Sequence, residues 1–554
     1  MDKPSSAGRK LSVAMIARNA EATIAAALAS VRSIADEIIV VDTGSTDRTW
    51  ELAQSRSSHL LHFPWTDDFS AARNFALSNL TGDWVLWLDS SEQLVGESAR
   101  QIRETIDLHP ERKVAYQLLV QLPAGAGQVD GEQIGRWRLW PRKAGLKFAG
   151  RVRETLSPPL DVAGLAQETT PWQILRSAHD VDPMVKAEKA RRDLRLAEME
   201  IEQVGPRLQL LLAMGEAWSA LGEPLKAAGW FRQVIDEAPA DSTDRLEAFY
   251  GLLTTFDSRP RSADEQVATC LEALQAFPLD AQLLCAMGSY LQKQGRLDLA
   301  CRSYQTAVEH GQVNLNTWHL ANLPDLAAMC YSMTLEMQGQ SDEACRAIES
   351  SLAKRGNSDR LRRQLIDLHI KHNRRQEALA EAQRLSDNSP NRDGLRDAIR
   401  GACLAAQQQW PAAMAYLKTA YEARCRDPIC LRWLAVGLMT AGDFASAEPL
   451  LRQWQATAPE SPEPQRLLQQ LNSQRQNAAS LNDADASKPW RVDGNGLGNG
   501  IEHGVGNGHG NGNGAAAHDG NGNGKGNSNS TANGHANGNG NGNYSILKPH
   551  AGGR

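Results

Sequence analysis

The sequence of 554 residues predicts an α/β domain, then an all-α solenoid, then a disordered tail, over residues 9–182, 183–475 and 476–554. Short apolar runs that recur about every 20–27 residues predict the α/β domain. A helical period with a recurrence of about 34 residues predicts the solenoid. Twenty of the 45 glycines lie in residues 491–554, interleaved with 14 asparagines, and such a segment cannot bury enough apolar surface to fold.

Four apolar runs are the expected strands of the α/β domain: residues 11–16, 38–41, 60–63 and 84–88. Continuous apolar runs at this spacing are typical of parallel strands that are covered by helices on both faces. The sequence between them predicts three helices, over residues 22–31, 46–54 and 70–78. Because ligands bind at the carboxyl ends of parallel strands, we expect the functional loops there.

An alanine recurs in the solenoid at one position of the second helix of each expected helix pair: Ala227, Ala300, Ala344, Ala378, Ala413 and Ala447. The last four are 34, 35 and 34 residues apart. A small residue there lets the two antiparallel helices of a pair approach closely. Residues 205–462 thus resemble the tetratricopeptide repeat family, with about six units, of which residues 246–278 form an irregular one. Unrelated helical hairpins are the alternative.

The resemblance to tetratricopeptide repeats implies a concave surface that binds a protein or peptide. The 59 basic and 65 acidic side chains give a net charge of −6, which argues against a nucleic-acid binder with a general basic surface. The eight cysteines include no CxxC pair and are interpreted as buried small residues of helices rather than as disulfides or zinc ligands.

Apolar segments are too short for an integral membrane segment, which needs about 18 uncharged apolar residues. The first apolar run is interrupted by Arg18 and Asn19, too early for a secretory signal. We therefore expect a cytoplasmic protein.

Polar residues follow the first two strands of the α/β domain. Arg18 and Asn19 end the first strand, and Asp42, Gly44 and Ser45 follow the second. An acidic residue at the end of a buried strand, followed by glycine and serine, favours a tight turn that presents amides and hydroxyls to a ligand. Capping of the next helix is a second interpretation of this turn, and the two roles can coexist.

The fourth strand ends in Asp89, which is followed by two serines and Glu92. Two acidic groups at such a strand end are suited to a nucleotide diphosphate-sugar. They would hold the ribose and a divalent metal that neutralises the departing diphosphate.

Five segments in the expected order make the first 180 residues similar to the family 2 glycosyltransferases with the GT-A fold. They are the Arg18-Asn19 strand end, the DTGSTDRT turn, the WTDDFSAARNFAL segment, the WLDSSE strand end and the FAGRVRE segment. More narrowly, the chain resembles the bacterial branch that carries tetratricopeptide repeats and includes the peptide S-glycosyltransferases. No GxGxxG follows the first strand, which argues against a dinucleotide-binding sheet.

The resemblance implies a nucleotide-sugar site made of Arg18, Asn19, Asp42, Gly44, Ser45, Arg73 and Asp89. In this site Asp42 would contact the uracil or ribose, Arg73 the nucleotide, and Asp89 would be the first acid of a DxD-type motif. The alternative for Arg73 is a helix-surface cation that pairs with Asp67 or Asp68.

Glu154 is the candidate general base, because inverting transfer needs a carboxylate that deprotonates the acceptor. A salt bridge of Glu154 with Arg151 or Arg153 is an equally weighted alternative.

Two positions depart from the pattern of the family. Ser91 replaces the second acid of the DxD-type motif, and Arg153 replaces the usual histidine before Glu154. Binding of Mn²⁺ or Mg²⁺ would then depend on Asp89, Glu92 and His179, with a structural role as the alternative for His179. Otherwise the diphosphate would be stabilised by arginines such as Arg138, Arg142, Arg151 or Arg153.

The sequence as a whole predicts a hexosyltransferase-type glycosyltransferase. It would move a sugar from a nucleotide-sugar, with UDP as the expected carrier, to a protein, peptide or glycan-precursor acceptor with inversion. The alternative, motivated by Ser91 and Arg153, is a degenerate transferase that serves as a non-catalytic protein-binding scaffold. Modification of the chain's own tail is a third hypothesis.

Overall fold

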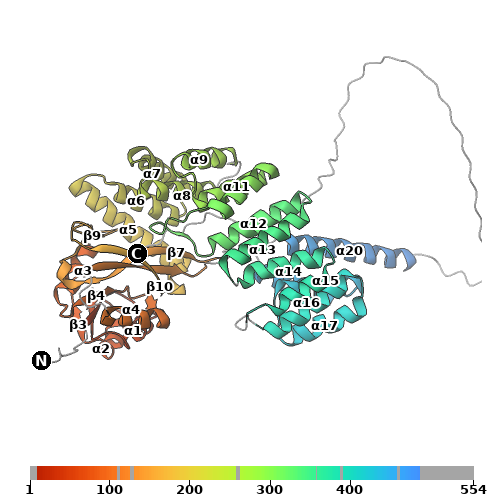
Figure 1. Cartoon of the computed structure of the whole chain (residues 1–554), viewed down its shortest axis with the longest axis horizontal. Helices are drawn as coiled ribbons and strands as arrows, with labels where there is room; N and C mark the ends of the chain where they lie inside the picture. Colours follow the sequence, from red (N-terminus) through yellow and green to blue (C-terminus); the bar gives the residue numbers. More distant parts are fainter. Residues whose placement is uncertain are drawn as a thin grey trace, which may run out of the picture.

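The computed structural model describes residues 9–108, 113–124, 130–257, 263–356, 358–386, 391–457 and 462–486. Figure 1 shows the α/β domain at the N-terminal end and helices that continue from it to the end of the described chain. The predicted fold class, an α/β domain followed by a helical solenoid, is confirmed in these residues. Most of the segment predicted to be a disordered tail lies outside the described residues.

The four predicted strands form a parallel group: β1 (Leu11–Ala17), β2 (Glu37–Asp42), β3 (His59–His62) and β4 (Trp84–Trp87). β1 lies in the middle, between β2 and β4, and β3 pairs with β2. β2 and β4 are buried along their whole length, which explains their continuous apolar sequences. The prediction of parallel strands is therefore confirmed for this half of the sheet.

The other half of the sheet is mixed rather than parallel. It is built from β5 (Glu92–Leu94), β6 (Val114–Leu122), β7 (Glu132–Pro141) and β10 (Ala166–Arg176). β7 runs antiparallel to both β4 and β6, while β10 is parallel to β6 and antiparallel to β5. A separate two-stranded sheet consists of β8 (Lys147–Ala149) and β9 (Thr155–Ser157).

Helices cover both faces of the sheet, as predicted. They are α1 (Ile24–Val31), α2 (Thr49–Gln54), α3 (Phe69–Ser78) and α4 (Gly96–Leu108). Buried side chains of α1, α2 and α4 share one core with Val13 and Met15 of β1. Ala76 of α3 belongs to a second core on the opposite face, with Ala14. α3 begins where the side chain of Asp68 accepts a hydrogen bond from the backbone of Ala71.

A long helix, α5 (Pro183–Val204), leads from the α/β domain into the solenoid (Figure 1). Seven helix pairs follow in the described chain: α6 (Leu208–Ala220) with α7 (Pro224–Glu237), α8 (Thr243–Asp257) with α9 (Ala263–Ala276), α10 (Ala281–Lys293) with α11 (Leu297–His310), α12 (Leu323–Met337) with α13 (Ser341–Arg355), α14 (Asp359–Lys371) with α15 (Arg375–Gln383), α16 (Arg392–Ala406) with α17 (Trp410–Glu422), and α18 (Pro428–Thr440) with α19 (Phe444–Thr457). The last described helix, α20 (Pro462–Ala486), continues past Gln476, where the tail was predicted to begin.

The six recurring alanines occupy the same place in the structure. Each is the fourth residue of the second helix of its pair, and each is fully buried. In α9 the fourth residue is Gln266, so this pair is the irregular unit that the sequence predicted. The eight cysteines are all buried and free, which confirms their interpretation as small core residues.

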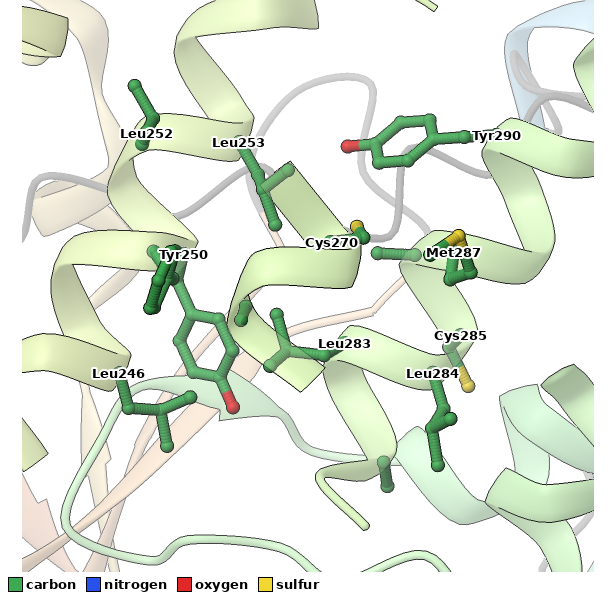
Figure 2. Packing of buried hydrophobic residues seen from close by; sticks show 14 of the residues in the cluster. Leu246, Tyr250, Leu252, Leu253, Cys270, Leu283, Leu284, Cys285, Met287 and Tyr290 are labelled. Carbon is green, nitrogen blue, oxygen red and sulfur yellow. The ribbon is translucent and has the colours of Figure 1, made fainter. Parts of the chain in front are cut away.

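Neighbouring helix pairs share buried clusters rather than packing as isolated hairpins. A single cluster of buried residues runs from Leu211 in α6 to Cys330 in α12. Figure 2 shows part of it, with Tyr250 of α8, Cys270 of α9 and Met287 of α10 among the side chains of the cluster. Burial shared between neighbouring pairs is the source of stability in repeat proteins.

The solenoid also contributes to the sheet of the α/β domain. The loop between α11 and α12 forms β11 (His319–Leu320), which pairs antiparallel with β7. The backbone N–H of Gly135 in β7 donates to the carbonyl of Leu315 in this loop at 2.6 Å. In the part of the chain that the structure describes, no helix is both long and apolar enough to cross a membrane.

Substitution of two helical glycines tests the close approach of paired helices. A Cβ on Gly288 of α10 would lie 2.7 Å from the buried ring of Tyr304, so Gly288→Ala should lower the free energy of unfolding by about 1–3 kcal/mol. The matched control is Gly229 of α7, whose added Cβ meets nothing within 4 Å. Gly229→Ala should raise stability by about 0.5–1 kcal/mol, and urea denaturation of both variants measures the contrast.

Candidate functional site

The loop after β2 is organised by the buried carboxylate of Asp42. Its Oδ1 accepts hydrogen bonds from the backbone N–H groups of Gly44 and Ser45, both at 2.9 Å. Gly44 has a φ of +99°, a conformation that glycine adopts without strain. Asp42 Oδ2 is buried and has no hydrogen-bond partner. An unpartnered buried carboxylate oxygen is costly, so this atom is available to a donor from a ligand.

The loops after β1 and β2 are tied to each other. The backbone N–H of Asn19 donates to the hydroxyl of Ser45 at 3.0 Å, and Asn19 Oδ1 accepts from the backbone of Thr46 at 2.9 Å. Ser45 therefore does not cap α2, and Asp47 instead accepts from the backbone of Thr49 at 3.0 Å. Arg18 is exposed beside this loop pair.

The second group of site residues meets at the end of β4. Arg73 of α3 is 5% exposed, and its guanidinium lies between two carboxylates. Its Nη1 is 3.3 Å from Asp89 Oδ1, and its Nη2 is 2.6 Å from Glu154 Oε1. The guanidinium also packs over the rings of Trp87 and Phe148. Arg73 thus joins the candidate DxD acid to the candidate base.

Neither predicted alternative partner of Arg73 contacts it. Asp67 pairs with Arg195 of α5 at 2.5 Å, and Asp68 caps α3. The alternative interpretation of Arg73 as a helix-surface cation is therefore wrong, because the residue is buried inside the domain. Glu154 forms its salt bridge with Arg73, and the predicted alternative partners Arg151 and Arg153 contact other residues instead.

Arg138 of β7 completes the charged cluster. Its Nη2 is 2.7 Å from Glu92 Oε1 and 3.1 Å from Asp89 Oδ2. Burial alone would raise the pKa of Asp89, but Arg73 and Arg138 outweigh it and hold the pKa well below its usual range. Burial raises the pKa of Glu92, and the nearby charge of Asp89 adds to this effect.

A cavity of about 370 Å³ opens onto this cluster. Its lining includes Arg73, Asp89, Glu92, Arg138 and Glu154, together with Arg136, Trp137 and Arg176. Trp318, from the loop between α11 and α12, forms part of the same wall. The solenoid therefore contributes directly to the cavity, which the sequence did not reveal.

Asp42 does not line the cavity, although it lies at the same edge of the sheet. It pairs in register with Ala17 of β1, and Asp89 follows Trp87, which pairs with Ala14 on the other side of β1. Neighbouring strands are about 4.8 Å apart, so the two backbones are separated by roughly 10 Å. A ligand that contacts both carboxylates has to extend across β1.

The residues present do not fit the predicted divalent metal. Guanidinium groups already lie against the carboxylates of Asp89 and Glu92. His179 is exposed, whereas its neighbour Asp180 is buried. The described residues include no group of three or more His, Cys, Asp or Glu side chains that could hold a metal ion. In the described residues, the structure therefore does not bring Asp89, Glu92 and His179 together as a set of ligands.

Ser91, at the position of the missing acid, is engaged by a carboxylate from elsewhere in the chain. Its hydroxyl donates to Asp180 Oδ2 at 2.7 Å. Asp180 is in turn paired with Arg176 at 3.0 Å and Lys189 at 2.8 Å. The sequence analysis did not identify Arg176 and Asp180 as residues of the site. Their position as charged residues directly after an apolar segment is a signal that would have indicated them.

Of the four arginines predicted to stabilise the diphosphate, only Arg138 lines the cavity. Arg142 donates to the carbonyl of Gly82 at 2.5 Å, at the opposite end of β4. Arg151 donates to the carbonyl of Asp67 at 3.0 Å, and Arg153 enters the solenoid. The prediction is wrong for these three, because their backbone positions direct the side chains elsewhere.

Comparison with known proteins supports the two-part organisation. Residues 12–133 match the model of the family described as glycosyl transferase family 2. A TPR repeat-containing protein of Synechococcus elongatus is 29% identical over 316 residues, which cover 54% of this chain and 75% of that protein. An uncharacterized glycosyltransferase of Rickettsia typhi is 38% identical over 111 residues, which cover 20% of this chain and 38% of the relative. The chain thus spans less than two fifths of the rickettsial protein.

Among solved structures, a tetratricopeptide repeat protein from Parabacteroides merdae matches with a TM-score of 0.36 and 14% identity, over 48% of this chain and 98% of that chain. The N-terminal part of the chain is thus similar to family 2 glycosyltransferases, and 54% of the chain is similar to a protein named for its tetratricopeptide repeats.

The ion pairs of Asp89 predict a pH-dependent contribution to stability. At pH 7, Asp89→Asn should lower the free energy of unfolding by about 3 kcal/mol, because two buried arginines lose a counter-charge. The pKa of Asp89 is lowered in the folded protein, so its stabilisation is complete above the unfolded-state pKa of about 3.9 and is lost as the pH falls below it.

Denaturation at a series of pH values tests this expectation. The difference between the wild type and Asp89→Asn should be constant at neutral pH and should shrink below about pH 4. Glu51→Gln, which removes an exposed ion pair with Arg48, is the control and should have a much smaller effect. A difference that stays constant down to pH 3 would contradict the assignment.

Proposed function

We propose that the protein transfers a sugar from a nucleotide-sugar donor to an acceptor, with UDP as the carrier and inversion at the anomeric carbon. The observation that carries this proposal is the chain of contacts Asp89–Arg73–Glu154 beside the cavity. It combines, in one place, an acid at a strand end, a cation and a second carboxylate. The family 2 match of residues 12–133 supports the reaction class.

The donor would bind across β1. Asp42 Oδ2, which lacks a partner, would accept a hydrogen bond from the uracil or the ribose. A nucleoside diphosphate is long enough to reach from there to Asp89 and the cavity beyond. Arg18, Asn19, Gly44 and Ser45 would form the loops that line this path, as the sequence predicts.

Glu154 is the proposed general base. It would take the proton from the acceptor nucleophile while that atom attacks the anomeric carbon and the bond to the diphosphate breaks. Negative charge then develops on the diphosphate, and Arg73 and Arg138 are preorganised cations at the cavity that would stabilise it. A shift of Arg73 from Glu154 to the diphosphate would break this ion pair, and the carboxylate of Glu154 would then accept the proton.

The acceptor is proposed to be a protein, a peptide or a glycan precursor. Trp318 of the solenoid lines the cavity with Trp137 of β7, so an acceptor bound by the repeats would reach the same space. Aromatic side chains offer apolar faces to either a sugar ring or a peptide side chain. This arrangement supports a role of the repeats in the choice of acceptor.

The catalytic role of Glu154 can be measured by release of UDP from a panel of UDP-sugars, with water or added acceptors. Glu154→Gln should lower kcat by about 10²–10⁴-fold, because the amide cannot accept the proton. UDP affinity should change little. Glu104→Gln on the exposed face of α4 is the matched control. If the wild type binds UDP but releases none from any donor, the non-catalytic scaffold becomes the better interpretation.

The poor fit of the site to a metal predicts that UDP binding is largely independent of divalent cations. Calorimetry in Mn²⁺ and in EDTA should give similar affinities. Arg138→Met should weaken UDP binding about tenfold or more, because a charge-assisted contact to the diphosphate is lost. Arg142→Met should leave UDP binding unchanged, because Arg142 lies at the opposite end of β4. A large loss of affinity in EDTA would show that the carboxylates rearrange to bind a metal.

A further inference from the structure

Arg153, at the position where the family usually has histidine, is buried between the two domains. Its side chain is 8% exposed and leaves the α/β domain to enter the first helix pairs. Nη1 is 2.5 Å from Glu216 Oε1 of α6, and Nη2 is 2.6 Å from Glu247 Oε2 of α8. Nε donates to Gln209 of α6 at 3.1 Å. One guanidinium thus joins two helix pairs of the solenoid to the α/β domain.

The charge around Arg153 makes this contact strong. Glu216 and Glu247 approach the same guanidinium, and Asp244 of α8 also interacts electrostatically with it. Burial raises the pKa of Asp244 and the neighbouring Glu247 raises it further, while Arg153 lowers it. Without the arginine, these carboxylates would repel one another across the α6–α8 contact.

The two residues before Arg153 are held by α5 and α6. The backbone N–H of Arg151 donates to Glu200 Oε2 of α5 at 2.7 Å. Val152 belongs to a buried cluster with Leu210 and Met214 of α6. Residues 151–153 are therefore anchored one after another on α5, α6 and α8.

Glu154 follows directly and faces the opposite way, toward Arg73. Arg153 has a φ of +50°, so the chain turns here in the left-handed region. The Cα atoms of residues 153 and 154 are about 3.8 Å apart, so a displacement of one residue moves the other. A misplacement of a catalytic group by about 1 Å can cost on the order of 100-fold in rate.

We propose that Arg153 is a positioning residue, through which the first two helix pairs of the solenoid hold Glu154 in the cavity. The proposal deepens the proposed function and rests on it. It assigns to the repeats a part in the geometry of the reaction, in addition to any part in acceptor binding. A movement of α6 against α8 would reach the candidate base through the side chain of Arg153, which contacts both helices.

The test uses three variants of the full chain: Arg153→Met, Arg153→Lys and Arg362→Met. Arg362 forms a buried ion pair with Glu381 between α14 and α15, so Arg362→Met controls for the loss of a buried ion pair other than that of Arg153. Arg153→Met should lower kcat of UDP release about 10- to 100-fold, with the KM of the donor changed by less than about threefold. Arg153→Lys should recover part of kcat, and Arg362→Met should keep it.

Hydrogen exchange supplies a readout that does not depend on activity. Amides of residues 148–157 should exchange faster in Arg153→Met than in the wild type, and at wild-type rates in Arg362→Met. If exchange in this segment is unchanged, or if Arg153→Met keeps wild-type kcat, the inference is overturned. If the wild type itself releases no UDP, the proposed function fails, while the exchange experiment still decides whether Arg153 holds the segment.

Discussion

The balance of buried charge at the end of β4 constrains the whole α/β domain. Asp89 and Glu92 are carboxylates inside the protein, and Arg73 and Arg138 lie against them and supply the counter-charge that such groups need. These residues come from α3, the loop after β4, β5 and β7, and Glu154 adds the segment before β9. Each of these elements therefore has to reach one point, and the cavity opens where they meet.

The solenoid is built into this arrangement rather than attached to it. β11 extends the sheet beside β7, Trp318 forms part of the cavity wall, and Arg153 connects the segment of Glu154 to α6 and α8. One of these contacts comes from the start of the solenoid, and the other two come from its middle, in the loop between α11 and α12. A protein bound on the repeats would thus act on a surface that is continuous with the candidate catalytic residues.

The two departures from the family pattern have different structural consequences. Ser91 removes a carboxylate from the site, and Asp180 reaches its hydroxyl but is already paired with two cations. Arg153 turns away from the cavity and becomes an interdomain contact. After both changes, arginines are the groups that neutralise negative charge in the site. Arginine binds oxygen anions through several directed hydrogen bonds.

The sequence by itself determined the local elements: the parallel strands, the helices between them and the alanines at the close contacts of the repeats. These follow from apolar periodicity and small side chains, which act over a few residues. Only the tertiary structure decided which charged side chains pair. Arg73 pairs with Glu154 instead of Asp67, and the buried side chain near Ser91 is that of Asp180 instead of His179. Such choices depend on which backbones fold next to each other, and residues 81 positions apart carry no periodic signal of their contact.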